Sequence, residues 1–100
     1  MIHSAAQYTQ VTRTQGITVV RCTAEWCMPC KQIAQPYSEL NMDGVRFYTI
    51  DVERVDDFAD VNSVKKLPCF FIFKDGKGVG MVIGANIQNL VKEVEKLQAE

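Results

Sequence analysis

One stretch decides how this chain folds, Ala24-Glu25-Trp26-Cys27-Met28-Pro29-Cys30-Lys31. Its two cysteines, Cys27 and Cys30, stand three residues apart, where a β-branched run ends and a helical pattern begins. Two cysteines on one helical turn lie close enough to close a small disulfide ring. The first of them falls at a helix N-terminus, where free N–H groups and the helix dipole favour the nucleophilic thiolate. The spacing therefore predicts a thiol–disulfide redox motif.

Length and composition predict a single domain over residues 1–100. The chain is 47% hydrophobic and 23% charged, which is ordinary for a globular protein. Its net charge of −1 gives no reason to expect nucleic acid or an anionic membrane as a partner. The longest apolar run, Cys69–Phe73, is too short to span a bilayer. Met1–Tyr8 lacks the pattern of a signal peptide, so the four cysteines favour a reducing compartment, and we expect a cytoplasmic protein.

Hydrophobic periodicity and turn signals predict nine elements. Strands are expected at residues 2–4, 17–23, 45–52, 69–73 and 78–83, and helices at residues 5–15, 30–40, 56–64 and 87–97. The order βαβαβαββα combines parallel strands joined by helices with a closing antiparallel hairpin. It predicts an α/β fold with a central mixed sheet flanked by helices on both faces.

The stretch from Trp26 to Lys31, followed later by Leu67-Pro68 and then by Gly84, resembles the thioredoxin family. The resemblance extends from Ile17 to Leu97 and implies the thioredoxin fold. It also implies a protein-disulfide reductase that acts on disulfide-containing proteins and is recharged by a thioredoxin reductase or an equivalent flavoprotein using NADPH. Such a protein is expected to be a monomer, with no metal and no cofactor beyond its redox-active disulfide.

The resemblance also implies roles for individual residues. Cys27 is expected to attack a substrate disulfide, and Cys30 to resolve the mixed disulfide that results. The Leu67–Pro68 peptide bond is expected to be cis, with the backbone of Leu67 pairing with the substrate. Pro29 favours a reducing poise in this family, so a reductant is expected rather than an oxidant. The substrate surface is expected to comprise Trp26, Met28, Pro29, Leu67, Pro68 and Gly84.

Arg21 is the main departure from the family pattern, which places a buried aspartate at this position to handle the proton of the resolving cysteine. An arginine cannot serve as a base. Because an unpaired buried charge is costly, we expect Arg21 to extend to water or to pair with Glu25 or Asp51. The alternative is that its charge lowers a cysteine pKa without transferring a proton.

Two cysteines outside the motif leave alternatives open. Cys69 follows the expected cis-proline, where threonine is usual, so it is either a third redox thiol near the motif or a small apolar filler. Cys22 is expected to act as a small hydrophobe in the central strand. Two other functions compete with disulfide reduction: a binding module with lost or secondary redox activity, and a zinc or iron–sulfur site built from Cys27, Cys30, Cys69 and Cys22.

Overall fold

The computed structural model describes residues 1–100 and is organised around strand β1 (Ile17–Thr23). Nearly every residue of this strand is buried, as its run of β-branched side chains predicts. β1 pairs in parallel with β2 (Val45–Asp51) and antiparallel with β3 (Cys69–Lys74), which in turn pairs antiparallel with β4 (Lys77–Ile83). The result is a mixed four-stranded sheet in the order β2-β1-β3-β4.

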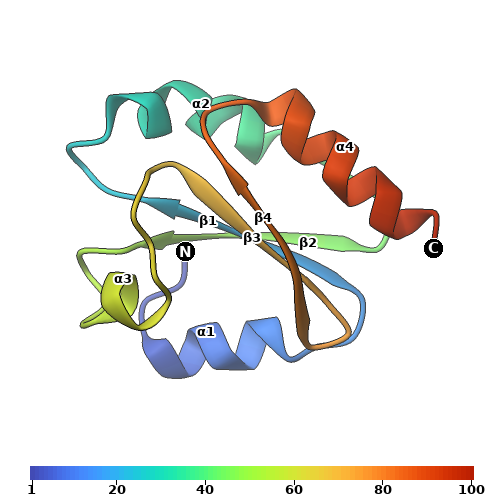
Figure 1. Ribbon diagram of the computed structural model, residues 1–100, viewed down its shortest axis with the longest axis horizontal. Helices are drawn as coiled ribbons and strands as arrows, with labels where there is room; N and C mark the ends of the chain where they lie inside the picture. Colours follow the sequence, from blue (N-terminus) through green and yellow to red (C-terminus); the bar gives the residue numbers. More distant parts are fainter.

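Helices cover both faces of this sheet. α2 (Met28–Ser38) and α4 (Ile87–Gln98) lie on one face, and α1 (Ala5–Thr12) and the short α3 (Phe58–Val61) lie on the other (Figure 1). The predicted α/β architecture, a mixed sheet between helical layers, is confirmed. No helix is long and apolar enough to cross a membrane.

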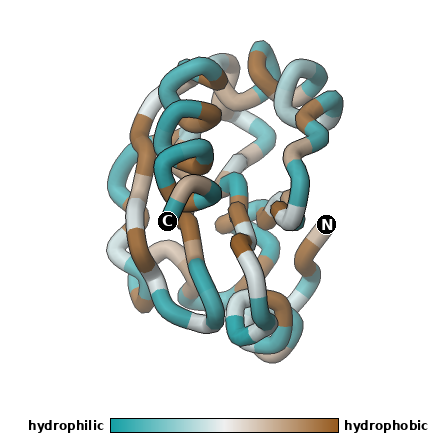
Figure 2. Tube along the Cα trace, turned by 90° about the vertical axis from the view of Figure 1, so that its right-hand side faces the viewer, coloured by the Kyte–Doolittle hydropathy of each residue, from teal (hydrophilic) through white to brown (hydrophobic).

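Each face of the sheet has its own hydrophobic core. Along β1, Val20 and Cys22 point toward the α1 and α3 layer, whereas Ile17 and Val19 point toward α2 and α4. This division follows from the alternation of side chains along a strand. Figure 2 shows the consequence, with hydrophobic segments along the strands in the interior and alternating hydrophilic and hydrophobic segments along the helices.

The expected first strand is wrong. Only Ile2 bridges the sheet, pairing in parallel with Ile50 and donating its N–H to the Thr49 carbonyl at 2.7 Å. The chain leaves the sheet edge at once because Ser4 caps α1, its side chain accepting the Gln7 N–H at 3.1 Å. Ile2 is nonetheless 2% exposed, so one residue anchors the N-terminus where a strand was expected.

Other helix boundaries shift by a few residues. α1 ends at Thr12 rather than at residue 15, and α2 begins at Met28, before the expected start at residue 30. α3 spans only Phe58–Val61 of the expected 56–64, because Asp57 adopts a left-handed conformation with φ of +59° just before it. A helix cannot extend backward through such a residue.

Candidate active site

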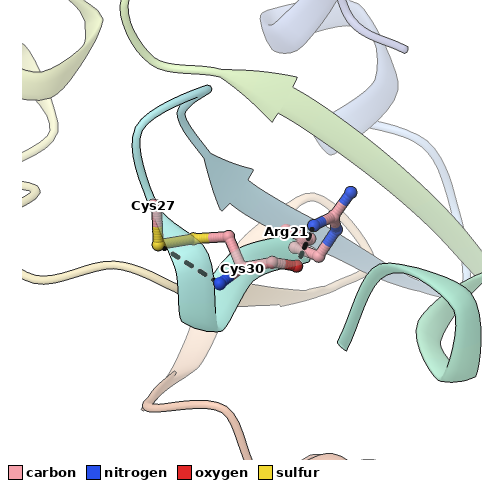
Figure 3. The surroundings of a disulfide bond; sticks show 3 residues. All are labelled: Arg21, Cys27 and Cys30. Carbon is pink, nitrogen blue, oxygen red and sulfur yellow. Dashed lines mark hydrogen bonds between the residues drawn. A yellow bond between two sulfur atoms is a disulfide. The ribbon is translucent and has the colours of Figure 1, made fainter. Parts of the chain in front are cut away.

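The two cysteines of the motif form a disulfide at the N-terminus of α2. Their Cα atoms are 5.3 Å apart, and Figure 3 shows the pair where the helix begins. Cys27 is the N-cap residue, and its sulfur accepts the Cys30 N–H at 3.2 Å. Pro29 occupies the first turn, where a missing N–H breaks no helical hydrogen bond. The chain therefore places a sulfur atom directly against the positive end of a helix dipole.

Exposed apolar side chains flank the buried disulfide. Cys30 is 0% exposed and Cys27 3% exposed. On either side of Cys27, Trp26 is 65% exposed and Met28 is 62% exposed. Large apolar groups in water are a feature of surfaces that bind other molecules. This arrangement gives the disulfide an apolar rim.

The chain segment before β3 carries the other expected site residues. The Leu67–Pro68 peptide bond is cis, and Pro68 is fully buried. The Pro68 carbonyl accepts the Gly84 N–H at 2.9 Å, which fixes the end of β4 beside this proline. Gly84 has φ of +105° and nothing within 4 Å of a Cβ built on it, so its surface is open. Leu67 and Trp26 line one shallow pocket of about 230 Å³.

Arg21 lies below α2, but its partners are not those expected from the sequence. It is only 9% exposed, so it does not extend into water. Its Nη1 donates to the Cys30 carbonyl at 3.3 Å, on the side away from the sulfurs, and its Nε donates to Thr49 Oγ1 at 3.4 Å (Figure 3 shows the first of these bonds). Its guanidinium carbon lies 5.3 Å from the centre of the Tyr37 ring, a cation–π distance.

The expected ion pair between Arg21 and Glu25 or Asp51 does not form. Both carboxylates instead bind Arg54: Glu25 through a short ion pair, and Asp51 with 3.5 Å between its Oδ2 and the arginine Nε. Burial lowers the pKa of Arg21, and the nearby Tyr37 opposes this shift. An arginine remains charged under these conditions. A positive charge without a carboxylate partner therefore lies under Cys30.

Tyr37 is the part of this site that sequence reasoning missed. In the sequence it is only one of the residues of the helix expected at residues 30–40. In the structure its hydroxyl donates to the Tyr48 carbonyl at 2.6 Å, and its ring supports Arg21. Burial strongly raises the pKa of Tyr37, although the Arg21 charge opposes this shift. No local pattern could reveal the contact, because Arg21 and Tyr37 meet only when α2 packs on β1.

The remaining cysteines, Cys22 and Cys69, are free and buried. They lie opposite each other on β1 and β3, a pairing that the sequence did not reveal. Across the chain, no group of three or more His, Cys, Asp or Glu side chains converges as metal ligands would. The zinc or iron–sulfur alternative therefore has no support in the geometry.

Taken together, the fold and the site define a class of proteins: mixed α/β domains with a dithiol–disulfide couple at a helix N-terminus. Comparisons with known proteins narrow this class. The thioredoxin family model matches residues 1–96. Thioredoxin-1 of Saccharomyces cerevisiae is 36% identical over 86 residues, covering 83% of this chain and 82% of the yeast protein. This chain therefore belongs to the thioredoxin family.

Other relatives agree with this assignment. A Populus jackii protein named thioredoxin H-type is 38% identical over 87 residues, but the match spans 85% of this chain and only 63% of the poplar protein. The crystal structure of thioredoxin from Trypanosoma brucei brucei superimposes with a TM-score of 0.92 at 30% identity, over 99% of this chain and 89% of that one. The family and the Cys27–Cys30 disulfide make the chain a thiol–disulfide oxidoreductase, and a binding module with lost or secondary redox activity is not favoured.

Proposed function

We propose that this chain reduces disulfides of protein substrates, with Cys27 as the attacking thiolate and Cys30 as the resolving thiol. The observation that carries the proposal is the placement of Cys27 as the N-cap of α2, between the exposed side chains of Trp26 and Met28. Its thiolate is stabilised there by the helix dipole and by the Cys30 N–H. Attack on a substrate disulfide forms a mixed disulfide, and attack by Cys30 on Cys27 releases the reduced substrate.

The residues around the disulfide form the proposed substrate surface, made up of Trp26, Met28, Pro29, Leu67, Pro68 and Gly84. Trp26 and Met28 offer apolar area on both sides of the attacking sulfur. The open backbone at Gly84 and the Leu67–Pro68 segment offer space for an extended peptide. Such a surface suits a polypeptide segment flanking a disulfide better than a small polar molecule.

We propose that proton transfer in this chain differs from the family pattern, because position 21 carries an arginine in place of the family's aspartate. Arg21 supplies positive charge through the Cys30 carbonyl and cannot accept a proton. We therefore assign it a modulating role, in which its charge favours thiolate over thiol. The proton of Cys30 then goes to solvent or to the departing substrate sulfur.

The family also suggests the upstream reductase, the oligomeric state and the compartment that we propose for this reaction. An upstream flavoprotein reductase using NADPH, of the thioredoxin reductase type, would return the disulfide to the dithiol. We propose that residues 1–100 act as one monomeric domain in the cytoplasm, with the Cys27–Cys30 disulfide as the only redox group needed. The relatives named thioredoxin support this setting.

The Cys30→Ser variant tests the assignment of roles. Without the resolving thiol, the Cys27 mixed disulfide cannot be released, so a disulfide substrate should remain covalently attached. Non-reducing electrophoresis and mass spectrometry of the adduct provide the measurement. The Cys27→Ser variant is the matched control and should trap nothing. An adduct on Cys30 in that control, or none on Cys27 in the first variant, would contradict the assignment.

A further inference from the structure

Cys22 and Cys69 form a closely matched pair. They are directly opposite each other in the antiparallel ladder of β1 and β3, so their side chains lie on the same face of the sheet. Their side chains belong to the same buried cluster. Both residues are buried, 0% and 2% exposed, and neither takes part in the existing disulfide. Two free thiols that face each other across neighbouring strands are the reactants of a disulfide.

The backbone hydrogen bonds establish how far apart the two residues sit. The Pro68 carbonyl accepts from Gly84 and therefore points toward β4. Because the polar groups of successive strand residues point to opposite sides, those of Cys69 point toward β1. Cys22 and Cys69 are thus a hydrogen-bonded pair, a type with Cα atoms about 5.5 Å apart. Disulfides span Cα separations of roughly 4.4–6.8 Å, which includes this value. Their Cβ atoms lie roughly 3.5–4.5 Å apart, closer than the roughly 4.5–5.5 Å of opposite strand residues, so closing the bond would draw β1 and β3 together at this point.

Burial limits which oxidant can reach these thiols. Tyr8 of α1 lies over this face with its ring packed edge-on against Phe58, 4.8 Å between centroids. A soluble disulfide such as glutathione disulfide would have to displace this cover. The Cys27–Cys30 disulfide, in contrast, belongs to the same buried cluster as Cys22 and Cys69. The nearest oxidant is therefore the disulfide of the active site.

We propose that Cys22 and Cys69 are a second, internal redox couple that exchanges with the Cys27–Cys30 disulfide. The proposal rests on the redox role assigned above to Cys27 and Cys30. This second couple would let the chain hold four electrons instead of two. A disulfide formed at the active site could be passed to Cys22 and Cys69, which leaves Cys27 and Cys30 reduced.

The exchange balances without any outside reactant. The Cys69 thiolate attacks Cys30, which breaks the Cys27–Cys30 bond and forms a Cys69–Cys30 bond. The Cys22 thiolate then attacks Cys69, forming the Cys22–Cys69 disulfide and releasing Cys30. The two protons lost by Cys22 and Cys69 are taken up by Cys27 and Cys30. Two electrons pass from the inner pair to the outer pair.

The order of attack follows from where the two thiols stand in the chain. Cys69 begins β3 and directly follows the cis Pro68, whereas Cys22 lies within β1. Cys69 is therefore assigned the first attack and Cys22 the second.

Disulfide mapping under controlled redox conditions tests the inference. The reduced chain is incubated with increasing ratios of oxidised to reduced glutathione, quenched in acid, alkylated after unfolding, and analysed by peptide mass spectrometry. In the wild-type chain we expect Cys27–Cys30 and Cys22–Cys69 disulfides together at the most oxidising ratios. Cys22→Ala and Cys69→Ala should each lose the inner disulfide and retain the outer one, with circular dichroism verifying that each variant is folded.

The double variant Cys27→Ser/Cys30→Ser tests the route. If exchange carries the oxidation, the inner disulfide should form about tenfold or more slowly in this variant, because glutathione disulfide must reach buried sulfur directly. Two results would overturn the inference: Cys22 and Cys69 alkylated at every ratio in the wild-type chain, or equally rapid oxidation in the double variant. Trapping by Cys30→Ser is independent of this outcome, so failure here leaves the role of Cys27 standing.

Discussion

Arg21 stands where the family has a buried aspartate, so the same position in the fold offers different chemistry. Its guanidinium donates to the Cys30 carbonyl and to Thr49 and is supported by the Tyr37 ring, so its charge is compensated without a carboxylate. Hydrogen bonds and a cation–π contact of this kind offset part of the cost of burying the charge. A positive charge that cannot accept a proton therefore remains next to Cys30.

Replacing Arg21 should therefore change the pH dependence of disulfide reduction. Arg21→Asp places an ionisable carboxylate beneath Cys30, and we expect its rate–pH profile to gain an inflection that the wild-type profile lacks. Arg21→Asn is the matched control, because it has the same shape but does not ionise. Reduction rates measured across pH for both variants provide the comparison. Identical profiles for the two variants would show that a carboxylate at this position does not take part in proton transfer.

The Tyr37 hydroxyl should stabilise the folded chain, and alkaline pH should remove this contribution. Its hydroxyl donates to the Tyr48 carbonyl inside the protein, so Tyr37→Phe should lower the free energy of unfolding by about 1 kcal/mol. Burial raises the pKa of Tyr37 above the unfolded value of about 10. The contribution of this group is therefore complete below that pH and is lost as pH rises toward the folded-state pKa.

Urea unfolding at neutral and at alkaline pH measures both effects. The wild-type chain should lose more stability than Tyr37→Phe as pH rises through the unfolded tyrosine range, because the variant has no proton to lose at this position. Parallel loss in the two chains would assign the alkaline sensitivity to other groups. Tyr8, whose pKa burial also raises, is unchanged in both chains and contributes equally to each.

Among the elements, α4 is a helix whose position can be predicted from local sequence patterns alone. Asn86 caps its first turn, and Leu90 and Val94 of its apolar stripe are buried against the sheet. These features could be predicted because a cap and a helical repeat are both local patterns. The expected strand at residues 2–4 is wrong because Ser4 caps α1 two residues after Ile2, so that only Ile2 pairs with the sheet, at Ile50.

The Asn86 cap should make a measurable contribution to stability. Its side chain accepts the Asn89 N–H at 3.0 Å, so Asn86→Ala should reduce the free energy of unfolding by about 1 kcal/mol. Asn89→Ala is the matched control, since it removes the same side chain from an exposed position and keeps the capped N–H. Chemical denaturation compares the two variants. Equal losses would mean that the cap contributes nothing beyond helix propensity.

For the whole molecule, the features that could be predicted from the sequence are those that depend on residues close together in the chain. The disulfide motif, the element order and the helical layers all follow from patterns within a few residues of one another. The Arg21–Tyr37 contact and the Cys22–Cys69 pairing could not be predicted, because each depends on how separate elements pack. The expected partners of Arg21 were wrong for the same reason, since Arg54 binds both carboxylates.

The most direct test of the central claim is the rate at which this chain accelerates the reduction of insulin disulfides by dithiothreitol. The account predicts rapid precipitation of the insulin B chain with the wild-type protein, because Cys27 attacks the insulin disulfide and dithiothreitol regenerates the dithiol. Cys27→Ser should fall to the rate of dithiothreitol alone. A wild-type rate no faster than dithiothreitol, or a Cys27→Ser rate equal to wild type, would contradict the account.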